Sequence, residues 1–458
     1  MGRSRVSGSL LFALLVGCVS LKQATAVVEA DEVKSFPGYG APPTKHYSGY
    51  ITIKESTHRR LHYLYVESVH PKTDPLVVWL QGGPGCSSLM GYFTENGPLY
   101  VHPDGKTLYQ NPNSWNLVAN MLYIEAPAGV GFSSSDSKMD YATNDSRTAD
   151  DNLKFLLGFF EAYPELRSRD FYISGESYAG IYIPTLSYDI LKHNEQASAQ
   201  EKINLQGILV GNGCIGAKVG VCGPEHALGY AVPFLYAHGL ISMKAWNVIR
   251  EKCGASKIIN TTACGQAVQS AMATTGPVNS LDIYGNCSDA TRRSAEPRFW
   301  VGSRERLGAE VHECIGGLNV EAYLRTPEVM DALHVTEPKF AGPWSMCSPF
   351  IEMMYTRSVA SLLDTVYPAL ISHYRVLIFN GDADAVVPYT DNEQWTSGMG
   401  YKEVAPFQAW LVDGQVAGYI TRYENDFSFA TVKGAGHMVP QFKPKAALAL
   451  LTNFLSNK

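Results

Sequence analysis

The 458-residue chain lacks several features that mark common protein classes. No cluster of lysine and arginine occurs in a chain whose formal net charge is −6, which argues against a nucleic-acid-binding surface. Beyond the first 26 residues, no apolar run is long enough to span a membrane. No Cys-x-x-Cys pair occurs, which argues against a zinc site or a redox dithiol. We therefore expect no metal, no cofactor, no nucleic-acid partner and no membrane span in the mature chain.

The first 26 residues carry a leader pattern. Arg3 and Arg5 precede an apolar run at residues 10–19, and the small residues Ala24 and Ala26 follow it. This arrangement is typical of a secretory signal peptide that is cut after residue 26. We therefore expect the mature chain in the secretory pathway, either secreted or in the lumen of a lysosome or vacuole.

Cysteine usage agrees with this compartment. Eight of the nine cysteines remain once the leader is removed. In an oxidising compartment this even number predicts four disulfides, although it leaves their pairing open. Sequons for N-glycosylation stand at Asn144, Asn260 and Asn286.

Apolar segments bounded by turn residues recur at both ends of the chain. Residues 46–66 alternate as an antiparallel hairpin does, and residues 150–163 have a helical period. The continuous apolar run at residues 75–80 predicts a strand buried on both faces, and further strands are predicted at residues 120–125, 171–174, 205–210, 376–379 and 427–432. Strands that alternate with helices predict an α/β fold, with a mostly parallel central sheet flanked by helices.

This alternation stops between about residues 214 and 365, where seven of the eight mature cysteines lie. We interpret this region as a large disulfide-bridged insertion, or cap subdomain, that covers one face of the core. The expected organisation is a signal peptide at 1–26, a first part of the core at 27–213, the insertion at 214–365 and a second part of the core at 366–458.

A serine stands between a predicted strand and a predicted helix. Residues 175–180 read Gly-Glu-Ser-Tyr-Ala-Gly, close to the Gly-x-Ser-x-Gly nucleophile elbow of α/β-hydrolases. Such turns are common, so the motif alone also fits an ordinary strand-to-helix turn. A serine hydroxyl becomes a good nucleophile only beside an imidazole that a carboxylate orients. These partners follow in the α/β-hydrolase order, with Asp382 or Asp384 after one strand and His437 after the last.

Acyl transfer also needs N–H donors for the oxyanion that forms at the attacked carbonyl. One donor is expected to be the main-chain N–H of Tyr178, the residue after the serine. The other should come from a glycine-rich loop early in the sheet, and residues 81–85 (Gln-Gly-Gly-Pro-Gly) follow the predicted strand 75–80.

Four motifs in this order resemble those of the serine carboxypeptidases, the family of cathepsin A and carboxypeptidase Y. They are residues 79–88 (Trp-Leu-Gln-Gly-Gly-Pro-Gly-Cys-Ser-Ser), 175–180, 381–384 (Gly-Asp-Ala-Asp) and 434–440 (Gly-Ala-Gly-His-Met-Val-Pro). The resemblance covers essentially the whole mature chain. It implies an α/β-hydrolase fold and a serine-type carboxypeptidase that cleaves the C-terminal residues of peptides and proteins through an acyl-enzyme.

The resemblance also implies roles for single residues. Ser177 would be the nucleophile, His437 the general base and acid, and Asp384 the partner of the imidazole. Gly83 and Tyr178 would form the oxyanion hole.

A site for the free C-terminal carboxylate of the substrate would consist of Gln81, Gly82, Glu95 and Glu176, with Gln81 where the family usually has asparagine. Two neighbouring carboxyl groups do not both ionise easily, so one of them keeps its proton to a higher pH than usual. A protonated carboxyl can donate a hydrogen bond to the carboxylate of the substrate. We therefore expect an acidic pH optimum for peptide hydrolysis.

By the same resemblance, the expected disulfides are Cys86–Cys347, Cys253–Cys264 and Cys287–Cys314, and Cys214 and Cys222 remain to form the fourth. The first of these would tie the insertion to the glycine-rich loop.

Two other functions stay open at this stage. Relatives with the same fold and triad pass the acyl group to an alcohol, so the chain could be an acyltransferase. It could also be a protective or binding protein, as cathepsin A is for partner glycosidases. The expected partners are peptide or protein C-termini, with a homodimer as an open alternative.

Overall fold

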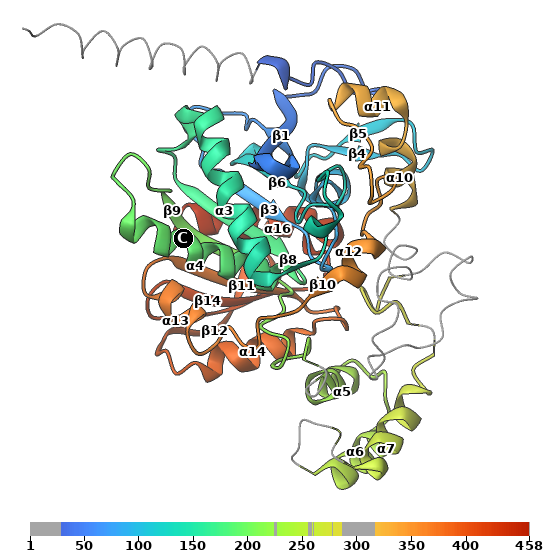
Figure 1. Ribbon diagram of the computed structural model, residues 1–458. Helices are drawn as coiled ribbons and strands as arrows, with labels where there is room; N and C mark the ends of the chain where they lie inside the picture. Colours follow the sequence, from blue (N-terminus) through green and yellow to red (C-terminus); the bar gives the residue numbers. More distant parts are fainter. Residues whose placement is uncertain are drawn as a thin grey trace, which may run out of the picture.

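The computed structural model describes residues 29–223, 227–254, 259, 261–276, 278–285 and 317–457. The predicted signal peptide, the sequons at Asn260 and Asn286, and the predicted Cys287–Cys314 bridge lie outside the described residues. A ten-stranded mixed sheet forms the centre of the molecule (Figure 1). No helix in the described ranges is long and apolar enough to cross a membrane.

The middle of the sheet is parallel, as the alternation of predicted strands and helices indicated. Its strand order is β1-β2-β6-β3-β8-β9-β11-β14-β13-β12, and neighbours from β6 to β14 run parallel. These six strands are β6 (Asn120–Ile124), β3 (Leu76–Leu80), β8 (Phe171–Glu176), β9 (Leu205–Gly211), β11 (Arg375–Gly381) and β14 (Phe427–Val432). Antiparallel pairs form both edges: β1 (His46–Lys54) with β2 (Arg59–Val66), and β12 (Glu403–Val412) with β13 (Gln415–Tyr423).

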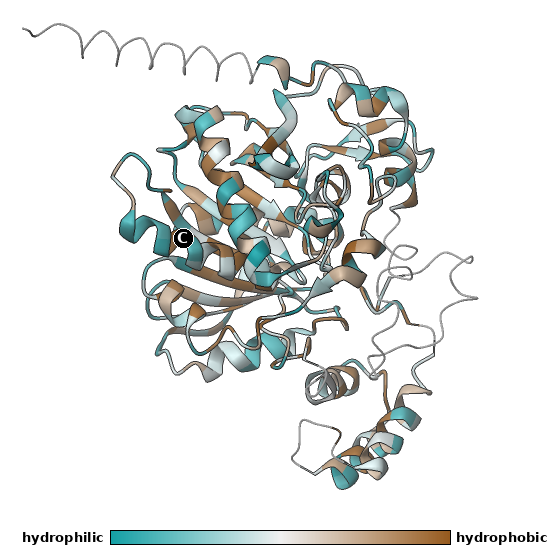
Figure 2. Ribbon diagram, in the orientation of Figure 1, coloured by the Kyte–Doolittle hydropathy of each residue, from teal (hydrophilic) through white to brown (hydrophobic). Residues whose placement is uncertain are grey.

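The sheet separates two apolar layers because successive side chains of a strand point to opposite faces. In β3, Val78 belongs to one buried cluster and Trp79 to the other, and neither side chain is exposed. Hydrophobic colour is concentrated in the central strands, whereas the outer turns of helices such as α3 are largely hydrophilic (Figure 2). This burial on both faces explains why the parallel strands lack the alternating pattern of the hairpin.

Helices cover both faces of the sheet. Helices α3 and α4 lie in front of the sheet and α16 behind it (Figure 1). The layer that contains α3 comprises α3 (Asp145–Ala162), α4 (Ala179–Gln196), α13 (Val366–Ile371) and α14 (Tyr389–Gly398). The opposite layer comprises α2 (Ser88–Gly91), η2 (Tyr92–Asn96), α10 (Leu318–Leu324), α11 (Pro327–Ala332), α15 (Val439–Phe442) and α16 (Pro444–Leu455). This arrangement confirms the expected α/β-hydrolase architecture.

The region between β9 and β11 contains the expected insertion. Its helices α5 (Ala227–Ala237), α6 (Met243–Cys253) and α7 (Thr262–Met272) share a small apolar cluster, and α6 and α7 lie at the outer end of the molecule (Figure 1). Farther along, α12 (Pro349–Met354) leads to the short strand β10 (Tyr355–Thr356), which pairs with β7 (Thr143–Asn144) of the core. The insertion therefore combines an outlying helical part with segments that pack directly on the core.

The remaining short elements lie in the connections. They are the strands β4 (Leu99–Val101) and β5 (Leu108–Gln110), and the single helical turns η1 (Glu55–Thr57), η3 (Trp115–Leu117), η4 (Lys138–Asp140) and η5 (Pro164–Leu166).

Three disulfides join cysteines of the described ranges. They are Cys86–Cys347, Cys214–Cys222 and Cys253–Cys264. All three are pairs that the family resemblance led us to expect, and only the first connects the insertion to the core.

Candidate active site

Five adjacent parallel strands end at the same edge of the sheet, and a residue of the candidate site follows each one. These residues are Gln81 after β3, Ser177 after β8, Asn212 after β9, Asp384 after β11 and His437 after β14. Ligands and substrates of open α/β sheets bind at the carboxyl ends of the strands. The topology thus gathers residues that are up to 356 positions apart in the sequence.

Ser177 occupies the tight turn between β8 and α4. Its φ angle is +63°, a left-handed conformation that non-glycine residues adopt rarely. The turn is held from both sides, because Ser177 N donates to Gly211 O at 3.0 Å and Cys214 N donates to Ser177 O at 3.0 Å. Strained backbone of this kind persists where the surrounding structure over-determines it, and it is found mainly at functional sites.

Two glycines allow the rest of the molecule to approach this turn. A Cβ on Gly175 would lie 2.0 Å from Leu80 O, and a Cβ on Gly180 would lie 2.4 Å from Cys214 O. Ala179, between Ser177 and Gly180, is fully buried. The close backbone contact is therefore made by Gly180. Position 179, where the general motif has its last glycine, can be alanine for this reason.

A buried carboxylate holds the imidazole of His437. Asp384 is inaccessible to solvent, and its Oδ2 lies 2.7 Å from His437 Nδ1. The same carboxylate accepts hydrogen bonds from the main-chain N–H groups of Val386 at 2.7 Å and Val387 at 3.1 Å. With these donors the carboxylate acts as an acceptor, so Nδ1 carries the proton and Nε2 is left free to accept one.

The structure distinguishes between the two aspartates that the sequence left open. Asp382 does not contact the imidazole: its Oδ1 accepts a hydrogen bond from Gly434 N at 2.6 Å. Asp382 therefore holds the loop that carries the histidine, and Asp384 holds the histidine itself. Burial raises the pKa of Asp382 above its ordinary value.

Asn212 was not singled out by the sequence analysis. Its Nδ2 donates to Asp384 Oδ2 at 2.7 Å, and its Oδ1 accepts from Gly381 N at 3.1 Å. Its φ of +42° lies in the left-handed region, where asparagine is more frequent than most residues. The only signal in the sequence is Gly-Asn-Gly at the end of an apolar strand, which resembles many ordinary turns.

The glycine-rich loop lies directly against the serine. A Cβ on Gly82 would be 2.5 Å from Ser177 Cβ and 2.6 Å from Tyr178 N. Any side chain at position 82 would therefore fill the space beside the Tyr178 N–H, one of the two expected oxyanion donors. Gly83, which was expected to supply the other donor, has a φ of +115° that favours glycine.

Gln81 joins the two glutamates of the expected carboxylate site. Its Oε1 accepts from Trp79 Nε1 at 2.8 Å, which orients the amide so that Nε2 faces the acids. Nε2 then donates to Glu95 Oε1 at 3.1 Å and to Glu176 Oε1 at 2.8 Å. The glutamine side chain, which is one methylene longer than the asparagine usual in the family, thus bonds to both acids.

The two glutamates share a buried environment, and Gln81 bonds to one oxygen of each carboxyl group. Burial raises the pKa of Glu95 to about 7. Burial and the neighbouring Glu95 charge raise the pKa of Glu176 well above its ordinary value. Among the described residues, Glu95 Oε2 has no hydrogen-bond partner. This pair can donate a hydrogen bond to an anion at neutral or acid pH.

The side chain of Tyr178 is anchored by a buried acid that the sequence analysis did not identify. Asp145 Oδ1 accepts from the hydroxyl groups of Tyr178 at 2.8 Å and Tyr355 at 2.9 Å, and its Oδ2 accepts from the N–H groups of Ser358 and Val359. The residue before Asp145 is Asn144, whose Oδ1 caps α3 by accepting a hydrogen bond from Arg147 N. Glycosylation of Asn144 stays a prediction. Asp145 thus ties the residue after the candidate nucleophile to the insertion.

The disulfide from the insertion ends in the glycine-rich loop. Beside Cys86–Cys347, Ser348 N donates to Gly85 O at 2.8 Å and Ser87 N donates to Met346 O at 2.7 Å. One covalent bond and two hydrogen bonds therefore fix this loop to the segment before α12.

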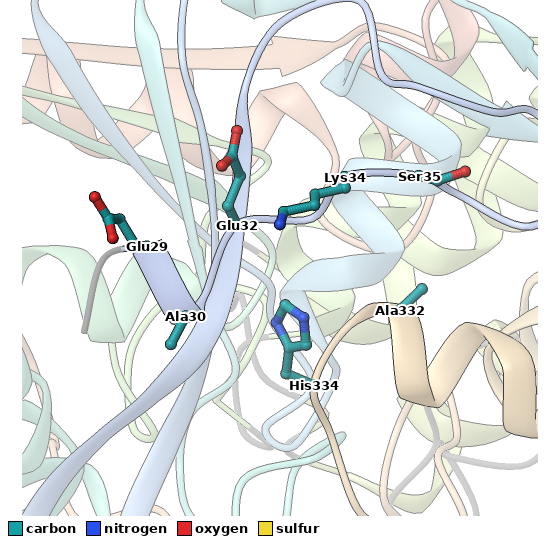
Figure 3. A pocket seen from close by; sticks show the side chains of 7 residues that line it. All are labelled: Glu29, Ala30, Glu32, Lys34, Ser35, Ala332 and His334. Atoms are coloured by element: carbon teal, nitrogen blue, oxygen red, sulfur yellow. The ribbon is translucent and has the colours of Figure 1, made fainter. Parts of the chain in front are cut away.

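A separate pocket lies away from these residues. It has a volume of about 450 Å³ and is lined by the N-terminal segment 29–35 and the residues around His334. Figure 3 shows the side chains of Lys34 and His334 pointing toward the same space, whereas the carboxylate of Glu32 points away from His334. None of its lining residues belongs to the candidate site, so we do not assign the reaction to this pocket.

Comparisons with known proteins test the family resemblance. A family model described as serine carboxypeptidase matches residues 37–457. Serine carboxypeptidase-like 20 of Arabidopsis thaliana is 36% identical in an alignment 472 positions long that covers 93% of each chain. The lysosomal protective protein of Mus musculus is 35% identical in an alignment 490 positions long that covers 98% of each chain.

A solved structure has the same fold. Kex1(Δ)p, described as a prohormone-processing carboxypeptidase from Saccharomyces cerevisiae, matches with a TM-score of 0.76 and 23% identity over 94% of this chain and 96% of the other. The family model, the identities over nearly full length and this shared fold confirm the resemblance that the four motifs indicated. The chain therefore belongs to the serine carboxypeptidase family and is a serine-type carboxypeptidase with an α/β-hydrolase fold.

Proposed function

We propose that the chain removes single residues from the C-terminal ends of peptides and proteins, through an acyl-enzyme and with an acid pH optimum. The observation that carries this proposal is the buried cluster of Gln81, Glu95 and Glu176. It lies beside Ser177, because Glu176 precedes the serine in the chain and Gly82, next to Gln81, touches it. A group that binds an anion next to a nucleophile suits a substrate whose scissile bond is adjacent to a free carboxylate.

In the first half of the reaction, Ser177 Oγ attacks the carbonyl carbon of the last peptide bond. Its proton passes to His437 Nε2, and Asp384 stabilises the imidazolium through Nδ1. The negative charge on the former carbonyl oxygen is stabilised by the N–H groups of Gly83 and Tyr178. The C–N bond then breaks, the imidazolium gives its proton to the leaving amine, and the C-terminal amino acid departs.

In the second half, water takes the place of the departed amine. It loses a proton to His437 Nε2 as its oxygen attacks the ester carbon, and the imidazolium returns that proton to Ser177 Oγ when the ester bond breaks. The product is the shortened peptide with a new C-terminal carboxylate. No metal or cofactor takes part in either half of this scheme.

The acid optimum follows from the glutamate pair. An acid whose pKa is raised keeps its proton below that pKa and loses it above, so a pair that begins to ionise near pH 7 is neutral at pH 5. A neutral pair donates to the carboxylate of the substrate, whereas an ionised pair repels it. Binding of peptides should therefore weaken as the pH rises above about 7.

The test is a panel of N-blocked dipeptides and their C-terminal amides, assayed from pH 4.5 to 9 with and without a serine-directed inhibitor. We expect the inhibitor to abolish cleavage of both forms. For dipeptides with a free carboxylate, KM should rise with pH, and for the amides it should be nearly constant. The same pH dependence of KM for both forms would contradict a carboxylate site at the glutamate pair.

Product analysis separates hydrolysis from acyl transfer. If the chain only passed acyl groups from sugar esters to alcohols and released no C-terminal amino acid from dipeptides, the proposal would be wrong. A Ser177→Ala variant separates catalysis from a protective or binding role, because catalysis requires the hydroxyl group and binding of a partner does not.

The compartment belongs to the same proposal. The leader pattern and the disulfides support passage through the secretory pathway, to the outside or to the lumen of a lysosome or vacuole. The acid optimum would suit such a lumen. A homodimer remains a separate hypothesis, for which sedimentation of the purified chain is the direct test.

A further inference from the structure

A short segment of the insertion, residues 279–283, crosses the two loops that carry Asp384 and His437; we call it the clamp. Ala385 N donates to Ser280 O at 2.9 Å, and Ile283 N donates to Ala383 O at 3.1 Å. These two bonds fix the main chain on both sides of Asp384. The clamp therefore holds the loop after β11 from the insertion side.

The clamp also holds the histidine. His437 N donates to Leu281 O at 2.7 Å, and Leu281 is buried. The approach is close, because a Cβ on Gly436 would lie 2.1 Å from Leu281 O and 2.7 Å from Asp282 Cβ. The glycine before the histidine is thus required where the clamp packs against the loop. One segment contacts the acid loop and the histidine loop at the same time.

A single side chain shapes this part of the clamp. Asn279 is 7% exposed, and its Oδ1 accepts from Leu281 N at 3.0 Å. An asparagine that bonds to the N–H two residues later forms an Asx turn, which fixes the direction of the intervening backbone. The turn presents Leu281 O to His437 N.

We propose that Asn279 is a positioning residue for the reaction. Through the turn, it sets the main chain of His437 relative to the Asp384 loop and so keeps the imidazole in line with both the acid and the serine. This inference rests on the proposed function, in which His437 transfers the proton. Asn279 does not touch the substrate, so it should affect the rate of the chemical steps and leave substrate binding unchanged.

The test compares Asn279→Ala, Asn279→Ser and the control Ser242→Ala. A displacement of about 1 Å at catalytic groups can cost about 100-fold in rate, so for Asn279→Ala we expect kcat to fall about 10- to 100-fold with KM within about twofold of wild type. Serine can form the same turn more weakly without adding a charge, so Asn279→Ser should recover part of kcat. Ser242 caps α6 with a bond of the same kind in the same insertion, but it does not contact the clamp, and Ser242→Ala should leave kcat and KM unchanged.

A second readout makes the result independent of the peptidase assignment. The rate at which an organophosphonate labels Ser177 depends on the triad and requires no peptide substrate, and it should fall in Asn279→Ala by the same factor as kcat. The far-UV circular dichroism spectrum and the melting temperature show whether each variant is folded. If Asn279→Ala does not fold, the test rests on Asn279→Ser, whose kcat and labelling rate should both fall by a smaller factor. Unchanged labelling in the folded variant, or equal losses in the alanine and serine variants, would overturn the positioning role. Intact labelling together with no peptide cleavage by the wild type would instead contradict the proposed function.

Discussion

Replacing both acids of the carboxylate site, Glu95→Gln together with Glu176→Gln, should remove the pH dependence of peptide binding. Glutamine has nearly the same shape as glutamic acid, and its amide can donate to a carboxylate at every pH. Gln81 donates to both acids through Nε2, and two glutamine side-chain oxygens can accept these bonds equally well. The double variant therefore keeps the hydrogen bonds and removes the titrating protons.

The expected size follows from the raised pKa of Glu95. If one proton that is lost near pH 7 is needed for binding, KM of the wild type should rise about tenfold per pH unit above pH 7, or about 100-fold by pH 9. In the double variant, KM should change less than about threefold over the same range. The variant should bind more weakly than wild type at pH 5, because an amide is a poorer donor than a carboxylic acid.

The raised pKa of Glu95 also affects the stability of the fold. The effect is opposite in sign to that of the usual carboxylate, whose pKa is lower in the folded state than in the unfolded state. A carboxyl that is harder to ionise in the folded state than in the unfolded state destabilises the fold once the pH exceeds the unfolded pKa. This destabilisation is absent below the ordinary pKa of 4.5 and reaches its full size only above the raised pKa of Glu95, about 7. The double variant should therefore have the melting temperature of wild type at pH 4.5 and a higher one at pH 8.

The assay measures kcat and KM for an N-blocked dipeptide at half-unit intervals from pH 4.5 to 9. Asp151→Asn is a suitable control, because burial raises the pKa of Asp151 to about 6 and its partner Arg59 lies outside the candidate site. That variant should retain the wild-type dependence of KM on pH. A double glutamine variant whose KM still rises as steeply as that of wild type above pH 7 would refute the role of the pair.

Three further substitutions test contacts around the triad. Asn212→Ala removes a donor from Asp384 and should lower kcat about tenfold with little change in KM, so an unchanged kcat would show that the Asp384 carboxylate is held without it. Gly82→Ala would place a methyl group 2.5 Å from Ser177 Cβ and 2.6 Å from Tyr178 N, so we expect a loss of at least about 100-fold in kcat/KM and a lower melting temperature; retained activity would mean that the loop can shift away from the serine. Asp145 accepts hydrogen bonds from two tyrosine hydroxyls and two main-chain N–H groups, and Asp145→Asn leaves one acceptor oxygen for them. Chemical denaturation should therefore show a free energy of unfolding lower by about 1–3 kcal/mol, and equal stability would contradict the contacts described.

The sequence predicted the parts of the molecule that depend on local pattern. Short strand-like segments that alternate with helical ones predicted the parallel sheet, and the order of the motifs after Ser177 indicated the loops of Asp384 and His437. The choice between Asp382 and Asp384 could not be made from spacing, because both follow the same strand and only the folded loops show which one faces the imidazole. Family resemblance, and not spacing, pointed to Asp384, the residue whose carboxylate bonds to the His437 imidazole.

The contacts between distant segments were missed for a common reason. Asn212 reaches an aspartate 172 positions later, and Asp145 reaches residues more than 200 positions later. Asparagine in a turn and aspartate at the start of a helix satisfy ordinary local rules, so nothing marks them as exceptional. The clamp lies in the insertion, where no regular period indicated how the chain returns to the core.

The disulfide between Cys86 and Cys347 forms only in an oxidising compartment, so the redox state of the compartment decides how firmly the glycine-rich loop is held. It spans 261 positions of the chain, and in chain-entropy terms closing such a loop disfavours the unfolded state by about 5 kcal/mol. In the cytosol, thiol reductants keep cysteines reduced, so a chain there would lack this cross-link. In such a chain the glycine-rich loop would be joined to the insertion through the hydrogen bonds of Ser87 and Ser348, with no covalent bond to hold it.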